Sequence, residues 1–214
     1  MGGALPAVTP DGTLLLHRFT VRPRHLDAFL AAWPDEVALR RRHGFTVHRA
    51  FVETIAEPKF TWLYSHPTPA SAEEALRADP LAADLAARVR PHVFGNTVVR
   101  PVRPEWLTEA TSESVTGRIA IMRRYSIVGD WAEFLAVWRA IVPVRERHGF
   151  RCLFAVADEP KDLFTWAFDF AGSWAEFAEA QRPYYADPER VALRRVFDYM
   201  ADYTIAPATQ LLVP

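Results

Sequence analysis

We predict an α+β fold for this chain, built from two tandem copies of one arrangement of strands and helices. Three observations support this prediction: short motifs that occur twice, the same succession of strand and helix patterns in each half, and a globular composition. The 214 residues include 50% hydrophobic and 24% charged side chains. That is enough apolar material to bury a sizeable core.

Four short motifs occur twice, in the same order and about 105 residues apart. Such an order indicates an internal duplication. We therefore predict a repeat at 13–103 and another at 117–213, joined by a polar linker at 104–116. The paired motifs are Phe-Leu-Ala-Ala-Trp at 29–33 with Phe-Leu-Ala-Val-Trp at 134–138, Arg-His-Gly-Phe at 42–45 and 147–150, Phe-Thr-Trp at 60–62 and 164–166, and Ala-Asp-Pro at 78–80 and 186–188.

Each repeat begins with a strand and an amphipathic helix. Branched and aromatic residues at 14–22 and 118–127 predict the strands. Gly44 and Gly149 are expected to end the helices in the left-handed conformation. The apolar stripes that predict the helices are Leu26, Phe29, Leu30, Trp33 and Val37 in the first repeat and Phe134, Leu135, Trp138, Ile141 and Val142 in the second.

Two strands, a second helical region and a last strand complete each repeat. The second helical regions begin near Ser71 and Ser173, and an Asp-Pro pair interrupts each of them. Asp79 and Asp187 are the predicted N-caps after these interruptions. The predicted strands are 45–55, 59–65 and 96–102 in the first repeat and 150–157, 163–170 and 203–212 in the second.

This order of elements, β-α-β-β-α-β, is the ferredoxin-like plan. A single copy has helices on one face of its sheet and leaves the other face uncovered. Two copies in one chain can cover those faces together. The predicted architecture is therefore two tandem ferredoxin-like repeats that form a fused pseudo-dimeric α+β barrel. Fusion is expected to make the protein a monomer, with a homodimer as the alternative.

The repeated motifs resemble the NIPSNAP family of the dimeric α+β barrel superfamily. The resemblance covers both halves, and the second half, with Arg-Glu-Arg-His-Gly-Phe at 145–150 and Tyr-Tyr-Ala-Asp-Pro-Glu at 184–189, matches better. It implies the same fold but no particular reaction. Relatives in the superfamily include cofactor-free monooxygenases, polyketide cyclases, haem-degrading enzymes and haem-dependent dehydratases.

Composition and motifs disfavour several classes of function. The 25 Lys and Arg residues nearly equal the 26 Asp and Glu residues, so no nucleic-acid partner is expected. Neither a membrane-spanning run nor a signal peptide is evident, so we expect a cytoplasmic protein without membrane contact. The single cysteine, Cys152, is expected to be a core residue. No metal site or nucleotide motif is recognisable, so we expect no cofactor, with haem on His66 or His92 as the alternative.

Aromatic residues on the third strand of each repeat are candidate walls of an apolar ligand pocket, with a plain aromatic core as the alternative. Strand side chains alternate, so Trp62 and Trp166 start equivalent rows. Asp169 has the opposite parity to Trp166 and is expected to face solvent or cap a turn. Tyr184 and Tyr185 either cover a pocket mouth or pack helix ends. The candidate substrate-binding residues are Trp62, Tyr64, Trp166, Phe168, Tyr184 and Tyr185.

Polar residues near those aromatics are candidate catalytic groups. If Phe19 and Tyr125 are equivalent, the first strands carry His17 and Arg123 at equivalent positions. An arginine in a strand covered on both faces either extends to solvent or holds a substrate carboxylate, enolate or phenolate. His66 or Tyr125 could transfer a proton. The candidate catalytic residues are therefore His17, His66, Arg123 and Tyr125.

These features favour a cofactor-independent enzyme that acts on a hydrophobic, aromatic or polyketide-like small molecule in bacterial metabolism. Its chemistry would be proton transfer (cyclisation, isomerisation or elimination) or oxygenation, with Arg123 or His17 stabilising an oxyanion. A non-catalytic small-molecule-binding or protein-interaction module is the first alternative, and a haem-binding protein is the second. Which half holds the pocket is left open, although every histidine except His148 lies in the first half.

Overall fold

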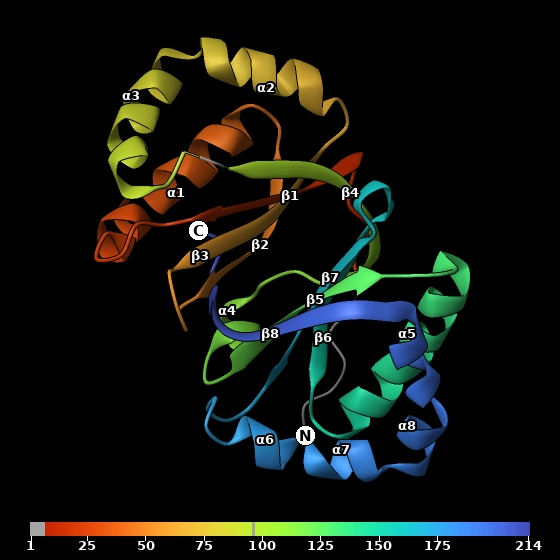
Figure 1. Ribbon diagram of the computed structural model, residues 1–214. Helices are drawn as coiled ribbons and strands as arrows, with labels where there is room; N and C mark the ends of the chain where they lie inside the picture. Colours follow the sequence, from red (N-terminus) through yellow and green to blue (C-terminus); the bar gives the residue numbers. More distant parts are fainter. Residues whose placement is uncertain (1–6, 96) are drawn as a thin grey trace. The chain divides into compact units, whose positions relative to one another are not determined.

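The computed structural model describes residues 7–95 and 97–214 (Figure 1). Two features of the sequence analysis lie outside these ranges: Asn96, which begins a predicted strand, and residues 1–6, where we expect no signal peptide. No helix in the described ranges combines the length and the apolar character that a membrane crossing requires.

The strands pair in the order β1-β3-β2-β8-β5-β7-β6-β4, and β4 pairs again with β1. The eight strands therefore close an antiparallel barrel, and helices occur between them in the sequence. This confirms the predicted α+β fold and its barrel. The origin of the barrel in two tandem ferredoxin-like repeats stays a prediction.

The chain forms two compact units, and we call the first of them the N-terminal unit. It comprises residues 9–102, 109–115 and 208–214. Within it β3 lies between β1 and β2, the first part of β4 pairs with β1, and the end of β8 pairs with β2. Its elements are β1 (Thr13–Thr20), α1 (Leu26–Arg42), β2 (Thr46–Glu53), β3 (Lys59–His66), α2 (Pro69–Ala78), α3 (Pro80–Val89), the 3-10 turn η1 (Arg90–His92), part of β4 (Val98–Leu107) and α4 (Ser112–Val115).

The C-terminal unit comprises residues 103–108 and 116–207, together with Ala7 and Val8. Here β7 lies between β5 and β6, and the second part of β4 pairs with β6. The second helical region is a series of short helices, not one long helix. The elements are β5 (Ile119–Ile127), α5 (Trp131–Arg147), β6 (Arg151–Asp158), η2 (Glu159–Lys161), β7 (Leu163–Phe170), α6 (Phe177–Ala180), α7 (Arg182–Ala186), α8 (Pro188–Ala192), η3 (Arg194–Tyr199) and part of β8 (Met200–Leu211).

In each unit, an aspartate side chain contacts the histidine at the end of the long helix, α1 or α5. The Asp79 side chain accepts a hydrogen bond from the Leu81 backbone N–H, and its Oδ2 lies 2.9 Å from Nε2 of His43. In the C-terminal unit Asp187 Oδ2 lies 2.9 Å from Nε2 of His148. Both aspartates are N-caps, as predicted, because each precedes a proline at the first helical position. The aspartate therefore links the end of one helix to the start of another.

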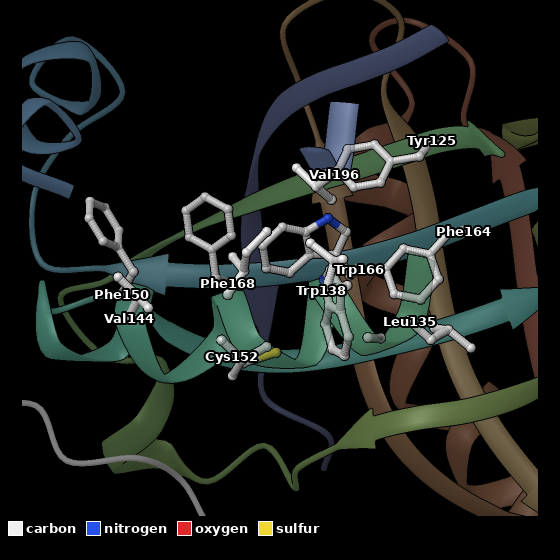
Figure 2. Packing of buried hydrophobic residues seen from close by; sticks show 14 of the residues in the cluster. Tyr125, Leu135, Trp138, Val144, Phe150, Cys152, Phe164, Trp166, Phe168 and Val196 are labelled. Atoms are coloured by element: carbon white, nitrogen blue, oxygen red, sulfur yellow. The ribbon is translucent and has the colours of Figure 1, made fainter. Parts of the chain in front are cut away.

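A separate apolar core lies between the helices and the strands of each unit. Figure 2 shows the C-terminal core, where Phe164, Trp166 and Phe168 form a row and Trp138 of α5 lies beside Trp166. Cys152 is 2% exposed within this cluster, which confirms the expectation of a core residue.

The expectation that Asp169 faces solvent or caps a turn is wrong. Its side chain is fully buried, because both faces of β7 are covered. Arg151 binds it with two hydrogen bonds, Nη2 to Oδ2 at 2.6 Å and Nε to Oδ1 at 3.0 Å, and Arg118 Nε donates to Oδ1 at 2.9 Å. This bidentate pairing is what makes a buried carboxylate tolerable.

Candidate functional site

Three arginines from three elements of the C-terminal unit line one small cavity. They are Arg123 on β5, Arg145 on α5 and Arg190 on α8, and each is at most 4% exposed. The Cζ atom of Arg145 lies 4.0 Å from the ring centroid of Tyr184, and that of Arg123 lies 5.9 Å from the centroid of Trp166. Aromatic faces stabilise these cations, but they do not neutralise them.

The three guanidinium groups have no counter-ion among the described residues. No aspartate or glutamate of the described ranges forms an ion pair with them, and the Nε–H groups of all three lack a hydrogen-bond partner there. Burial of charged groups without partners is strongly unfavourable. The arrangement is thus complementary to an anion that comes from outside the chain.

Tyr185 lies at the exposed edge of this cluster. Burial tends to raise the pKa of its hydroxyl, but the charges of Arg123 and Arg145 and their hydrogen bonds to it outweigh that effect and lower the pKa to about 8. A phenol with this pKa is partly ionised near neutral pH. Tyr185 is therefore equipped to accept a proton, and its hydroxyl oxygen already accepts hydrogen bonds from Arg123 and Arg145.

The cavity between these side chains has a volume of about 20 Å³. That is space for about one water molecule. Tyr185 and Phe197 are the most exposed members of its lining, at 36% and 41%, and they form the rim through which a larger molecule would enter. The lining residues are Arg123, Tyr125, Trp138, Ile141, Arg145, Trp166, Tyr184, Tyr185, Arg190, Val196, Phe197 and Met200.

The N-terminal unit also has an arginine at the equivalent helix position, but there carboxylates balance its charge. Arg40 is the third residue from the end of the 17-residue α1, as Arg145 is in the 17-residue α5. Arg40, however, has two carboxylate partners: Glu36 Oε1 is 3.3 Å from its Nε, and Glu73 Oε1 is 2.6 Å from its Nη1. The position of Glu36 is occupied by Ile141 in α5. Only the C-terminal unit therefore has an uncompensated cation at this position.

The first strands of the two units, β1 and β5, also differ in charge at equivalent positions. His17 pairs with Trp62 across β1 and β3, as Arg123 pairs with Trp166 across β5 and β7. Burial, assisted by the charge of Arg40, lowers the pKa of His17 to about 3. An uncharged imidazole in the N-terminal unit thus occupies the position that a guanidinium occupies in the C-terminal unit.

We expect the buried histidines to make the protein sensitive to acid. Burial lowers the pKa of His48 to about 4 and that of His17 to about 3, whereas both groups have a pKa near 6.5 in the unfolded chain. Between these values the unfolded state binds more protons, so stability falls as the pH drops below about 6.5. Each histidine can contribute up to about 1.4 kcal/mol per pH unit. Urea unfolding from neutral pH towards pH 4 checks this.

The substitution His17→Phe should make that pH dependence shallower than in the unmodified protein. The comparison between the two proteins cancels the contribution of carboxylates, which also titrate in acid. Parallel curves for the two proteins would contradict the assignment of acid sensitivity to His17.

The predicted site residues fall into three groups. Arg123, Tyr125, Trp166, Tyr184 and Tyr185 lie together on the C-terminal cavity, and Phe168 lies behind them with its ring centroid 4.1 Å from Cζ of Arg145. His17 and Trp62 line a cavity of the N-terminal unit, and Tyr64 contacts Trp62 at a centroid distance of 4.6 Å. His66 stands apart.

His66 is held by its surroundings, not by either cluster. Its Nδ1 accepts a hydrogen bond from the Thr68 backbone N–H at 2.9 Å, and its ring packs on Phe45 at 4.9 Å. His92 faces His25, with 3.0 Å between their Nδ1 atoms. Within the described ranges no third histidine, cysteine or carboxylate joins such a pair to complete a metal site.

The sequence analysis missed Arg145, Arg190 and Glu36. One signal for Arg145 was available, because it follows Ile141 by four residues and so extends the apolar stripe of α5. A charged residue on a core-facing stripe is unusual. Arg190 carried no such signal, since its position depends on how α7 and α8 fold back.

No family model and no curated protein matches the chain. Solved structures do match. A candidate monooxygenase from Fusobacterium nucleatum is 11% identical, with a TM-score of 0.64 over 95% of this chain and 94% of that one. An anthrone oxidase-like protein is also 11% identical, with a TM-score of 0.60 over 96% and 94%.

A NIPSNAP domain protein from Burkholderia xenovorans is 13% identical, with a TM-score of 0.37 over 47% of this chain and 96% of that one. The neighbours therefore include a NIPSNAP domain protein with partial coverage and monooxygenase-like proteins. At such low identity, the matches with TM-scores of 0.64 and 0.60 show the fold alone. Membership of the NIPSNAP family stays a prediction.

Proposed function

We propose that this protein is a cofactor-independent enzyme that binds a hydrophobic, aromatic small molecule in its C-terminal unit and stabilises an anion on it. The observation that carries the proposal is the cluster of Arg123, Arg145 and Arg190, buried without a carboxylate partner among the described residues. A substrate carboxylate, enolate or phenolate would supply the missing charge. Tyr185 and Phe197, the most exposed aromatic side chains of the lining, would contact its rings.

The proposed chemistry starts with a proton transfer. The phenolate oxygen of Tyr185 takes a proton from a carbon or hydroxyl acid of the substrate, which leaves an enolate or phenolate and a neutral tyrosine. The oxyanion then replaces Tyr185 as the partner of Arg123 and Arg145, whose positive charges stabilise it without reorganisation. The proton returns to product or solvent at the end of the cycle.

Several outcomes are open to such an anion. Protonation at another atom is an isomerisation, loss of a leaving group is an elimination, and attack on a carbonyl of the same molecule is a cyclisation. Reaction with dioxygen as the co-substrate is an oxygenation. Similarity to a candidate monooxygenase and to an anthrone oxidase-like protein supports the last of these, at the level of fold only.

We propose a cytoplasmic, bacterial protein of small-molecule metabolism that needs no cofactor, whose tandem ferredoxin-like repeats make a monomer self-sufficient. Light scattering would distinguish this monomer from a homodimer. A Soret band in the purified protein would instead support the haem alternative, and its absence is the expected result.

Binding of matched probes tests the charge preference. We expect 2-naphthoate to bind at least about tenfold more tightly than 2-naphthamide, which has the same rings without the charge. Arg123→Gln should remove most of that difference. Equal binding of the two probes would overturn the proposal.

Turnover of anthrone separates an enzyme from a binding module. We expect the protein to accelerate deuterium uptake from D2O or oxygen consumption with no cofactor added. Selective binding of naphthoate without any acceleration, for anthrone or for a panel of related carbon acids, would favour the non-catalytic binding module.

A further inference from the structure

The N-terminal unit contains a cavity that the proposed function does not use. Its volume is about 100 Å³, and it lies between β1, β3 and α1. Thr97 of its lining is exposed, so the cavity reaches the surface. The lining residues are His17, Phe19, Phe29, Ala32, Trp33, Glu36, Trp62, Val89, Val93 and Thr97.

The walls of this cavity are almost entirely apolar. Trp33 and Trp62 pack edge to face at a centroid distance of 4.7 Å, and Phe19 and Phe29 do so at 5.5 Å. An engineered apolar cavity of about 150 Å³ is known to bind benzene. The size and lining of the cavity thus suit one small ring.

Three polar side chains of this cavity lack a hydrogen-bond partner among the described residues: the indole Nε1 atoms of Trp33 and Trp62, which can only donate, and the ring of His17, which can donate and accept. Both ring nitrogens of His17 are shielded from solvent and have no hydrogen-bond partner among the described residues. A buried polar group in this state gains from any ligand that can donate or accept a hydrogen bond. His17 lies 5.6 Å from Trp62 between ring centroids, so a ligand ring stacked against Trp62 is within its reach.

Charge makes this cavity different from the arginine cluster. Arg40 is already paired with Glu36 and Glu73, and burial raises the pKa of Glu36. His17 is uncharged at neutral pH. The cavity therefore offers no free positive charge, and an anion that entered it would be buried without a partner.

We infer that this cavity, defined by His17, Trp33 and Trp62, is a second ligand site that takes a small uncharged aromatic molecule with one hydroxyl or similar hydrogen-bonding group. The proposal does not depend on the function proposed for the C-terminal unit. The two units thus differ in the ligand charge that they prefer at equivalent positions. The C-terminal unit prefers an anion beside Arg123, and the N-terminal unit prefers a neutral ring beside His17.

Calorimetric titration with three probes of one ring size tests the preference. Phenol is neutral and carries a hydroxyl, toluene is neutral without one, and benzoate is an anion. We expect phenol to bind most tightly and about fivefold more tightly than toluene, which is the effect of one net hydrogen bond. Benzoate should not compete with phenol for this cavity.

Two substitutions on α1 locate the binding. Ala32→Leu adds three carbons to a side chain that lines the cavity and should abolish phenol binding. Ala31→Leu adds the same atoms to an exposed neighbour and should leave phenol binding unchanged. His17→Leu should reduce the phenol affinity to that of toluene.

If the His17→Leu variant does not fold, nuclear magnetic resonance of the histidine rings tests the same contact. In protein labelled at the histidine ring nitrogens, phenol should shift the His17 resonances in the parent and in Ala31→Leu, but not in Ala32→Leu. Phenol binding that survives Ala32→Leu, benzoate that competes with phenol, or His17 resonances that do not respond would each overturn the proposal.

Discussion

Arg145→Met is expected to stabilise the ligand-free protein by about 1–2 kcal/mol and to abolish selective binding of 2-naphthoate. The substitution removes a buried cation that has no carboxylate partner among the described residues and replaces it with an apolar side chain of similar length. The contacts of the guanidinium with Tyr184 and Phe168 are lost, which reduces the gain. Urea unfolding at neutral pH measures the change.

Arg40→Met is the matched control, because it changes the same residue type at the same helix position of the other unit. Here the change removes the partner of Glu36 and Glu73, which lie against Arg40 at 3.3 and 2.6 Å. Both carboxylates are partly accessible, so we expect a loss of about 2–3 kcal/mol, below the value for a fully buried pair. The free energy of unfolding should therefore rise in Arg145→Met and fall in Arg40→Met. Equal destabilisation by the two changes would mean that the charge of Arg145 is compensated, and the anion site would then be withdrawn.

Local rules were sufficient to predict most of the fold. Gly44 and Gly149 follow α1 and α5 with φ of +80° and +84°, the left-handed conformation that glycine permits at a helix end. Strand alternation placed Trp62 and Trp166 on equivalent faces, and the observed pairing with His17 and Arg123 agrees with the alignment of the first strands. The glycine conformations and the strand alternation depend on residues close together in the chain.

The site could not be predicted from patterns of residues that are close together in the chain. Arg190 reaches the cavity only because the second helical region breaks into short helices, and the sequence suggested one interrupted helix. The burial of Asp169 depends on Arg151 and Arg118, which come from two other parts of the chain. The missing charge partner of Arg145 is visible only when every nearby carboxylate has been placed. Tertiary contacts determine all three.

Tyr185→Phe is expected to reduce the catalysed proton transfer by at least about 100-fold, the usual contribution of a positioned base. The substitution keeps the ring at the rim of the cavity and removes the only atom that would accept the proton. Binding of 2-naphthoate should persist, because the three arginines remain. Tyr203→Phe is the matched control, since Tyr203 is 51% exposed and does not line the cavity. It should retain full activity.

The pH profile distinguishes a base from a residue that only shapes the site. The pKa of Tyr185 is lowered to about 8, so the fraction of active phenolate increases as the pH rises through that value. The kcat/KM of the unmodified protein should therefore rise towards pH 8 and level off above it, because kcat/KM reports the groups of the free enzyme. In Tyr185→Phe this rise should be absent from the residual activity. If the rise persists in the variant, another group is the base, and Tyr185 would keep only a binding role beside Arg123 and Arg145.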